Sequence, residues 1–117
     1  MTKVGEAWRS VTIQMESPEG TVYVRVARPP IPSSRRGVEV HLGKSGGVGQ
    51  AAAEGLGRLV SLLTNHIPIA SIAKSLRGVT HERSGWMVER GEFEGSSLCD
   101  ALARGLLIAE SELGDDR

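Results

Sequence analysis

The chain has 117 residues, of which 14 are Lys or Arg and 14 are Asp or Glu, so its formal net charge at pH 7 is zero. This length is typical of one domain that folds without disulfide or metal cross-links. The balanced charge excludes a global positive field that would attract nucleic acid or a membrane surface. The single cysteine, Cys99, excludes an internal disulfide, and because the N-terminus shows no signal-peptide pattern we expect a cytoplasmic protein.

Three stretches near the N-terminus alternate between apolar and polar residues, which is typical of half-buried β-strands. They are residues 8–15, 21–28 and 38–42. Proline and glycine in residues 17–20 favour a tight turn, so the first two strands form a hairpin. The proline-rich residues 29–37 cannot continue a ladder and are expected to form a surface loop. The third strand is then most simply antiparallel to the second.

The apolar period changes to that of a helix between residues 50 and 64. We expect an apolar face made of Ala52, Leu56, Leu59 or Val60, and Leu63, and a polar face made of Gln50, Glu54, Arg58 and Ser61. Gly55 and Gly57 each cost a helix about 1 kcal/mol relative to alanine. Their presence indicates that another backbone, from a strand or a second subunit, approaches this helix.

Two further helices follow. The first opens at Pro68 and ends at Gly78, and the second is capped by Ser97 and Asp100 and carries a stripe that includes Leu102. Apolar residues cover so much of the last helix that it is either deeply buried or shared with a partner chain, so we expect a homo-oligomer. The predicted fold is α+β, with a three-stranded antiparallel β-meander followed by three helices packed on one face of the sheet. Its core spans about residues 8–113, and a flexible C-terminal tail follows.

Residues 43–49, Gly-Lys-Ser-Gly-Gly-Val-Gly, join the third strand to the first helix. Backbone amides at a helix N-terminus, together with Lys44, are suited to hold an anion. The segment is not a nucleoside-triphosphatase phosphate loop, because Val38 occupies the position of that motif's first glycine. The alternative is that the glycines only allow the helix to pack closely against the strand.

Residues 79–95 form a second candidate ligand-binding segment, in which Trp86 either anchors the loop or stacks on a base. Arg35 and Arg36 precede the strand that leads to Lys44, so they could approach the same end of the sheet. The candidate ligand-binding residues are Lys44, Ser45, Gly46, Gly47, Val48, Gly49, Arg35, Arg36, His81, Ser84 and Trp86. No acid–base pair or activated nucleophile is visible, so we expect no catalytic residue, and we assign no metal and no cofactor.

The order of these elements, with the blocks at residues 43–61 and 97–104, resembles the TSCPD domain over about residues 10–108. That domain is similar to a C-terminal module of adenosylcobalamin-dependent class II ribonucleotide reductases and also occurs as small free-standing proteins. The family's Thr-Ser-Cys-Pro-Asp motif falls on residues 96–100, where Leu98 takes the place of the cysteine and Cys99 that of the proline. Another family cysteine falls on His81. The resemblance therefore implies a module linked to nucleotide metabolism, without a two-cysteine metal or redox pair.

The leading hypothesis is a non-catalytic, oligomeric nucleotide-binding protein, a sensor or a sequestering protein, in which the glycine-rich segment holds phosphate and residues 79–95 close on a base. The alternative is an accessory or assembly module that binds a ribonucleotide reductase polypeptide through an apolar helix face and holds no ligand. A small hydrolase is a third and less favoured possibility. No nucleic acid or membrane partner is expected, because no basic, aromatic-rich stretch and no run of about 20 apolar residues occurs.

Overall fold

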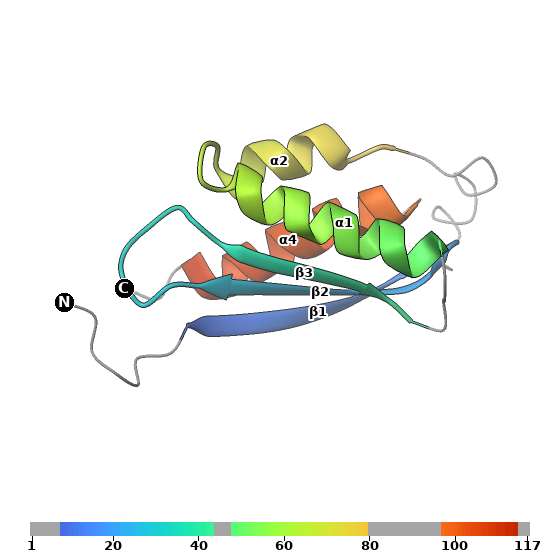
Figure 1. The fold of residues 1–117 in the computed structure, drawn as a ribbon, viewed down its shortest axis with the longest axis horizontal. Helices are drawn as coiled ribbons and strands as arrows, with labels where there is room; N and C mark the ends of the chain where they lie inside the picture. Colours follow the sequence, from blue (N-terminus) through green and yellow to red (C-terminus); the bar gives the residue numbers. More distant parts are fainter. Residues whose placement is uncertain (1–7, 44–47, 80–96, 115–117) are drawn as a thin grey trace.

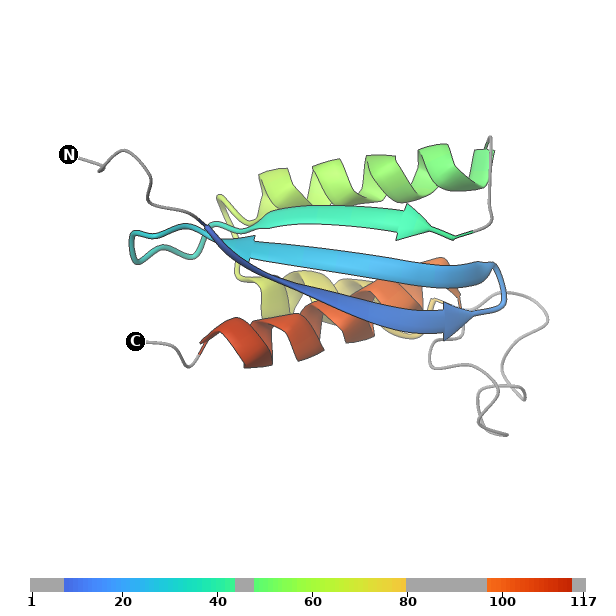
Figure 2. The ribbon, with the colours of Figure 1, turned by 90° about the horizontal axis from the view of Figure 1, so that it is seen from below.

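A computed structural model describes residues 8–43, 48–79 and 97–114 of the chain (Figure 1). The elements are β1 (Arg9–Ser17), β2 (Gly20–Arg28), β3 (Gly37–Leu42), α1 (Val48–Leu63), α2 (Ile69–Leu76) and α4 (Leu98–Gly114). The strands form one antiparallel sheet in the order β1-β2-β3. Helix α1 packs on β3 and α4 packs on β1 and β2, on the same face of the sheet, and α2 lies outside them against α4 (Figures 1 and 2). The predicted α+β fold is confirmed.

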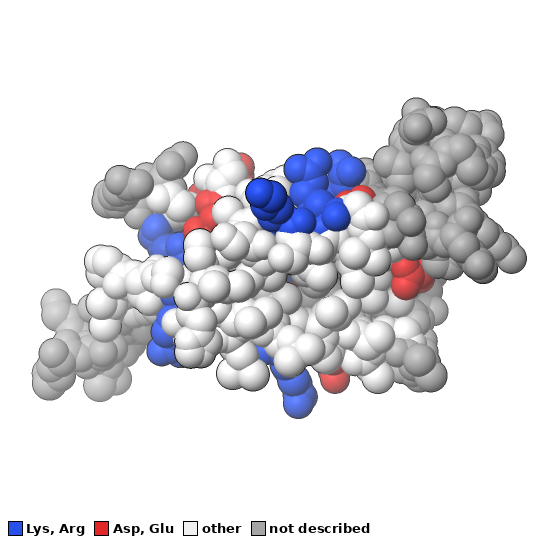
Figure 3. Space-filling model, turned by 90° about the horizontal axis from the view of Figure 1, so that it is seen from above, with Lys and Arg blue, Asp and Glu red and all other residues white. Residues whose placement is uncertain are grey.

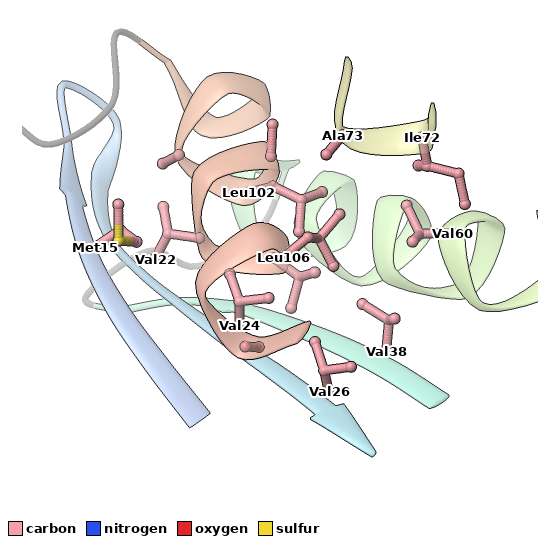
Figure 4. Packing of buried hydrophobic residues seen from close by; sticks show 14 of the residues in the cluster. Met15, Val22, Val24, Val26, Val38, Val60, Ile72, Ala73, Leu102 and Leu106 are labelled. Carbon is pink, nitrogen blue, oxygen red and sulfur yellow. The ribbon is translucent and has the colours of Figure 1, made fainter. Parts of the chain in front are cut away.

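The sheet has one apolar face because alternate residues of each strand point toward the helices. That face carries Met15, Val22, Val24, Val26, Val38, Val40 and Leu42, all buried. The opposite face is polar and includes an exposed ion pair, with Arg25 Nη1 3.3 Å from Glu39 Oε2. The core therefore lies between the sheet and the helices and is almost entirely aliphatic (Figure 4).

Helix α4 occupies the centre of the molecule. A Cβ atom placed on Gly105 would lie 2.9 Å from Val24 Cγ2, so only glycine allows the helix to come this close to β2. The other side of α4 is covered by α2, whose Ile72 and Ala73 are buried. The broad apolar surface of α4 is thus buried by its own chain, and a partner chain is not needed to cover it. Ile108 is the large apolar residue of α4 that is exposed, at 44%.

Helix α1 is held to the outer edge of β3 by side-chain hydrogen bonds. Ser61 Oγ accepts from Val38 N at 2.7 Å and donates to Val38 O at 3.0 Å. Near the C-terminal end of the helix, Thr64 Oγ1 accepts from Arg36 N at 2.9 Å. In its first turn, Gln50 Oε1 accepts from Leu42 N at 3.0 Å. These bonds satisfy backbone groups that an edge strand would otherwise leave unpaired.

Gly57 lies between these contacts and lets the helix come close to the strand. A Cβ atom at Gly57 would lie 3.0 Å from Val40 N and 3.3 Å from Val38 O. The expectation that a strand lies against this glycine is therefore confirmed. Gly55 behaves differently, because a Cβ atom there would meet no described atom within 4 Å.

The buried face of α1 differs from the expected one. Val60 is buried and Leu56 is half-buried as expected, but Ala52, Leu59 and Leu63 are exposed. Gln50 and Ser61, which the sequence pattern placed on the polar face, bind β3. The helix is rotated because its polar side chains satisfy the edge of β3, and this turns part of its apolar face to solvent.

Helix α2 agrees with its predicted boundaries. It begins after Pro68, and Gly78, which follows the helix, has a positive φ of 83° that favours glycine. Within the described ranges, no helix combines the length and the apolar character needed to cross a membrane.

The first testable prediction concerns the two glycines of α1. We expect Gly57→Ala to lower the free energy of unfolding by about 1–3 kcal/mol, because the new methyl group forces α1 away from β3. Gly55→Ala is the matched control and should gain up to about 1 kcal/mol from helix propensity. Chemical denaturation of both variants measures the difference, and equal stabilities would contradict the close approach at Gly57.

The second prediction concerns the hydroxyl of Thr64, which is fully buried. Thr64→Val keeps the side-chain shape but removes the acceptor for Arg36 N, which should cost about 1–3 kcal/mol of stability. Ser75→Ala is the control, because Ser75 is exposed and its hydroxyl bonds within α2, to Ser71 O. Thermal unfolding followed by circular dichroism compares the two, and a Thr64→Val protein as stable as the control would refute this role.

Candidate functional site

Ser97 and Asp100, at the start of α4, form hydrogen bonds to Val79 and Gly78, which follow α2. These bonds connect the two described parts of the chain that flank residues 80–96. Ser97 Oγ donates to Val79 O and accepts from Asp100 N, the latter at 3.1 Å. Asp100 Oδ1 accepts from Gly78 N at 2.9 Å. We call these four residues, Gly78, Val79, Ser97 and Asp100, the clasp. The clasp therefore holds Val79 and Ser97, the described residues on either side of residues 80–96, in contact with each other.

The carboxylate of Asp100 is the central acceptor of the clasp. It is buried, with 1% of its side chain exposed, and its Oδ2 lies 2.9 Å from Arg104 Nε one helical turn away. A negative charge in the first turn of α4 also interacts favourably with the N-terminal end of the helix. The sequence pattern identified Asp100 as a helix cap, but gave no signal for its bond to Gly78.

The turn between β1 and β2 connects the clasp to the start of the glycine-rich segment. Glu19 Oε1 accepts from Leu98 N at 2.7 Å, so this turn is tied to the N-terminus of α4. On its other side, Gly43 N donates to Thr21 O at 2.8 Å, and a Cβ atom at Gly20 would lie 3.3 Å from Gly43 O. We call this region, from Gly43 across the turn to the clasp, the loop end of the domain.

The loop end gathers the two segments that the sequence pattern favoured for ligand binding. Residues 44–47 run from Gly43 into α1, and residues 80–96 begin and end at the clasp. The N-termini of α1 and α4 both lie at this end of the molecule (Figures 1 and 2). Glu19 is the residue of this region that sequence analysis missed, and its position in a predicted turn gave no indication of a distant helix partner.

Most of the candidate ligand-binding residues lie outside the described residues. They are Lys44, Ser45, Gly46, Gly47, His81, Ser84 and Trp86. Val48 and Gly49 are the first two residues of α1. Helix α1 therefore begins within residues 43–49, two residues before the start at Gln50 that the sequence pattern predicted.

Arg35 and Arg36 lie at the opposite end of β3 from Gly43. The strand has six residues, which span about 20 Å, so neither arginine belongs to the loop end. Arg36 donates from Nε and Nη2 to the Glu110 carboxylate, at 2.8 Å each, and its side chain is only 8% exposed. The Arg35 guanidinium lies 6.0 Å from the centroid of the Trp8 ring. These arginines precede β3, whereas Gly43, the described residue next to Lys44 in the chain, follows it, so they do not share the end of the sheet as expected.

The thiol of Cys99 lies in the first turn of α4. Burial, and secondarily the negative charge of Glu19, raises the pKa of this thiol above its usual value. A thiol that is protonated at neutral pH is a poor nucleophile. Among the described residues, no group of three or more His, Cys, Asp or Glu side chains is placed to hold a metal ion.

A shallow groove also runs between α1 and the outer part of β3. It is lined by Val38, Glu39, Val40, His41, Glu54 and Arg58. Its charges are mixed, and it lies along the side of the domain, so it offers no concentrated positive site for an anion. The loop end remains the region whose described residues flank both candidate segments.

The family model of the TSCPD domain matches residues 2–110, which cover nearly the whole chain and include every described strand and helix except the last turn of α4. No curated protein and no solved structure matches the chain significantly. The matched range includes all four residues of the clasp. The chain therefore belongs to the TSCPD domain family.

Proposed function

We propose that this protein binds a nucleotide, or another small molecule that carries phosphate, at the loop end and does not transform it. The supporting observation is a difference between the two helix N-termini of that region. The N-terminus of α4 carries Asp100 in its first turn and binds the Glu19 carboxylate. Helix α1 has no acidic residue in its first turn.

The first four backbone N–H groups of a helix have no partner within the helix, and the helix dipole adds partial positive charge there. At α4, Asp100 places a negative charge in the first turn and the Glu19 carboxylate accepts a hydrogen bond from Leu98 N. At α1 the approaching segment is Lys44-Ser45-Gly46-Gly47, which supplies one cation and further amides without a carboxylate. In the proposal, phosphate occupies the N-terminus of α1 and Lys44 contributes a compact positive charge.

Residues 80–96 complete the proposed site because both of their ends are fixed at the clasp. This segment contains Trp86, whose ring offers an apolar face for a base, and His81 and Ser84, which offer hydrogen-bonding groups. A binding role without chemistry agrees with the protonated thiol of Cys99. Arg35 and Arg36 are not part of the proposed site.

The third prediction tests ligand binding. Isothermal titration calorimetry of the full chain against a panel of linear, cyclic and deoxy nucleotides should show heat for at least one member. Lys44→Ala should weaken that binding by about 10- to 100-fold, the value of one charge-assisted hydrogen bond. Arg35→Ala is the matched control, because it removes a cation at the far end of β3 and should leave binding unchanged. Absence of heat with every nucleotide at millimolar concentration would refute the proposal.

The fourth prediction tests the clasp. Asp100→Ala should lower the free energy of unfolding by about 2 kcal/mol, because Gly78 N and Arg104 lose a charged acceptor. It should also weaken ligand binding, because residues 80–96 are no longer held at both ends. Asp100→Asn keeps an acceptor for Gly78 N, so it should lose less stability and less ligand affinity than Asp100→Ala. If Asp100→Ala retained full stability and full affinity, the clasp would have no such role.

A second candidate function is an accessory module that binds a ribonucleotide reductase polypeptide without a small ligand. The observation in its favour is the group of exposed leucines on α1, Leu59, Leu62 and Leu63. Co-purification with a reductase that lacks its own C-terminal module would support it. Pairing of these leucines between two copies of this chain would count against it, because the surface would then be occupied.

A further inference from the structure

The side-chain amide of Gln50 joins the first turn of α1 to the end of β3. Gln50 Oε1 accepts from Leu42 N at 3.0 Å, and Gln50 Nε2 lies 3.2 Å from His41 Nδ1. Leu42 is buried, whereas His41 is exposed. One amide group thus contacts both the backbone of a buried residue and the side chain of a residue that solvent reaches.

The chemistry of these groups fixes the protonation state of His41 in this arrangement. A backbone N–H can only donate, so the Gln50 atom that faces Leu42 N is the carbonyl oxygen. The other amide atom, Nε2, can only donate as well, and it faces His41 Nδ1. This ring nitrogen must therefore offer a lone pair, which means that His41 is neutral and carries its proton on Nε2.

Protonation of His41 is incompatible with this arrangement. Both ring nitrogens of a charged imidazolium are donors, so Nδ1–H would point at the amino group of Gln50. Turning the amide by half a turn places Oε1 on His41, but the amino group then faces Leu42 N, which is also a donor. Because a hydrogen bond to a charged donor is about twice as strong as a neutral one, the oxygen moves to His41. Leu42 N then loses its acceptor.

The charged groups around His41 are balanced in sign. Among the described residues, the titratable and charged side chains on the elements packed beside it are Glu39 on β3, Tyr23 and Arg25 on β2, and Glu54 and Arg58 on α1. The rest of the surface seen from the side of α1 and α2 is largely uncharged (Figure 3). Because the carboxylates and the guanidinium groups offset each other, the bond to Gln50 decides what protonation of His41 changes.

We propose that Gln50 and His41 form a proton-dependent latch between α1 and β3. With His41 neutral, Gln50 binds the backbone of Leu42 and fixes the first turn of α1 to the strand. With His41 protonated, Gln50 binds the imidazolium instead, and the edge of β3 at Leu42 is released to water. The latch is a property of the domain without any ligand and does not rest on the proposed function, although it holds the helix turn to which that function assigns phosphate.

The fifth prediction is measured by NMR hydrogen exchange of the full chain without ligand, at about pH 7.5 and at about pH 5.5, between which histidine gains its proton. The protection factor of the Leu42 amide should fall by about 2- to 10-fold at the lower pH, the effect of losing one hydrogen bond. Val38 N is the control amide, because it lies on the same edge of β3, donates to Ser61 Oγ at 2.7 Å and should keep its protection. An unchanged Leu42 amide, or an equal fall at Val38, would overturn the proposal.

Three variants separate the latch from a general loosening in acid. His41→Gln cannot be protonated and should leave the protection of Leu42 independent of pH. Gln50→Glu keeps the side-chain shape but offers two acceptor oxygens, so Leu42 N and the imidazolium are both satisfied and the response should vanish. His66→Gln is the matched control, because His66 is exposed beyond the C-terminal end of α1, and it should retain the wild-type response. A response that persists in His41→Gln or in Gln50→Glu would contradict the latch.

The tautomer of His41 provides an independent check. The chemical shifts of its ring nitrogens at about pH 8, where histidine is neutral, should show the proton on Nε2 and a lone pair on Nδ1. A neutral His41 that carries its proton on Nδ1 could not accept from Gln50, and this result would overturn the proposal at its first step.

Discussion

The hydrogen bonds between α1 and the outer edge of β3 determine most of what this domain presents to solvent. An edge strand exposes unpaired backbone groups, and this protein satisfies them with Gln50, Ser61 and Thr64 from a helix and its C-terminal turn instead of with another strand. Gly57 makes the arrangement possible because it lets the helix backbone approach the strand. The same bonds fix the rotation of α1 about its axis, and this rotation leaves a row of leucines outside the core.

The position of α4 at the centre has a second consequence. Its N-terminus is occupied by carboxylates from the chain itself, Asp100 from within the helix and Glu19 from the hairpin turn. These contacts stabilise the helix start and fix both ends of residues 80–96 at the clasp. The start of α4 thus has a structural role, with Ser97 and Asp100 as hydrogen-bonding residues and Leu98 in the core.

The proposed phosphate site depends on the difference between the two helix N-termini at the loop end. The N-terminus of α4 already has carboxylates of the chain beside it, whereas α1 has no acidic residue in its first turn. A phosphate at the N-terminus of α1 would therefore not compete with a first-turn carboxylate for the backbone N–H groups of the helix.

The elements, their order and much of the core could be predicted from the amino-acid sequence, because strand alternation and turn residues are local signals. Pro68 and Gly78 marked α2 correctly, and Ser97 with Asp100 marked the start of α4. The side of α1 that faces inward could not be predicted in this way, because it depends on hydrogen bonds to backbone groups of β3 that the apolar pattern of the helix does not record. The tertiary structure likewise separated Arg36 from Gly43, where the glycine-rich segment begins, since a strand places the residues before and after it at opposite ends of the sheet.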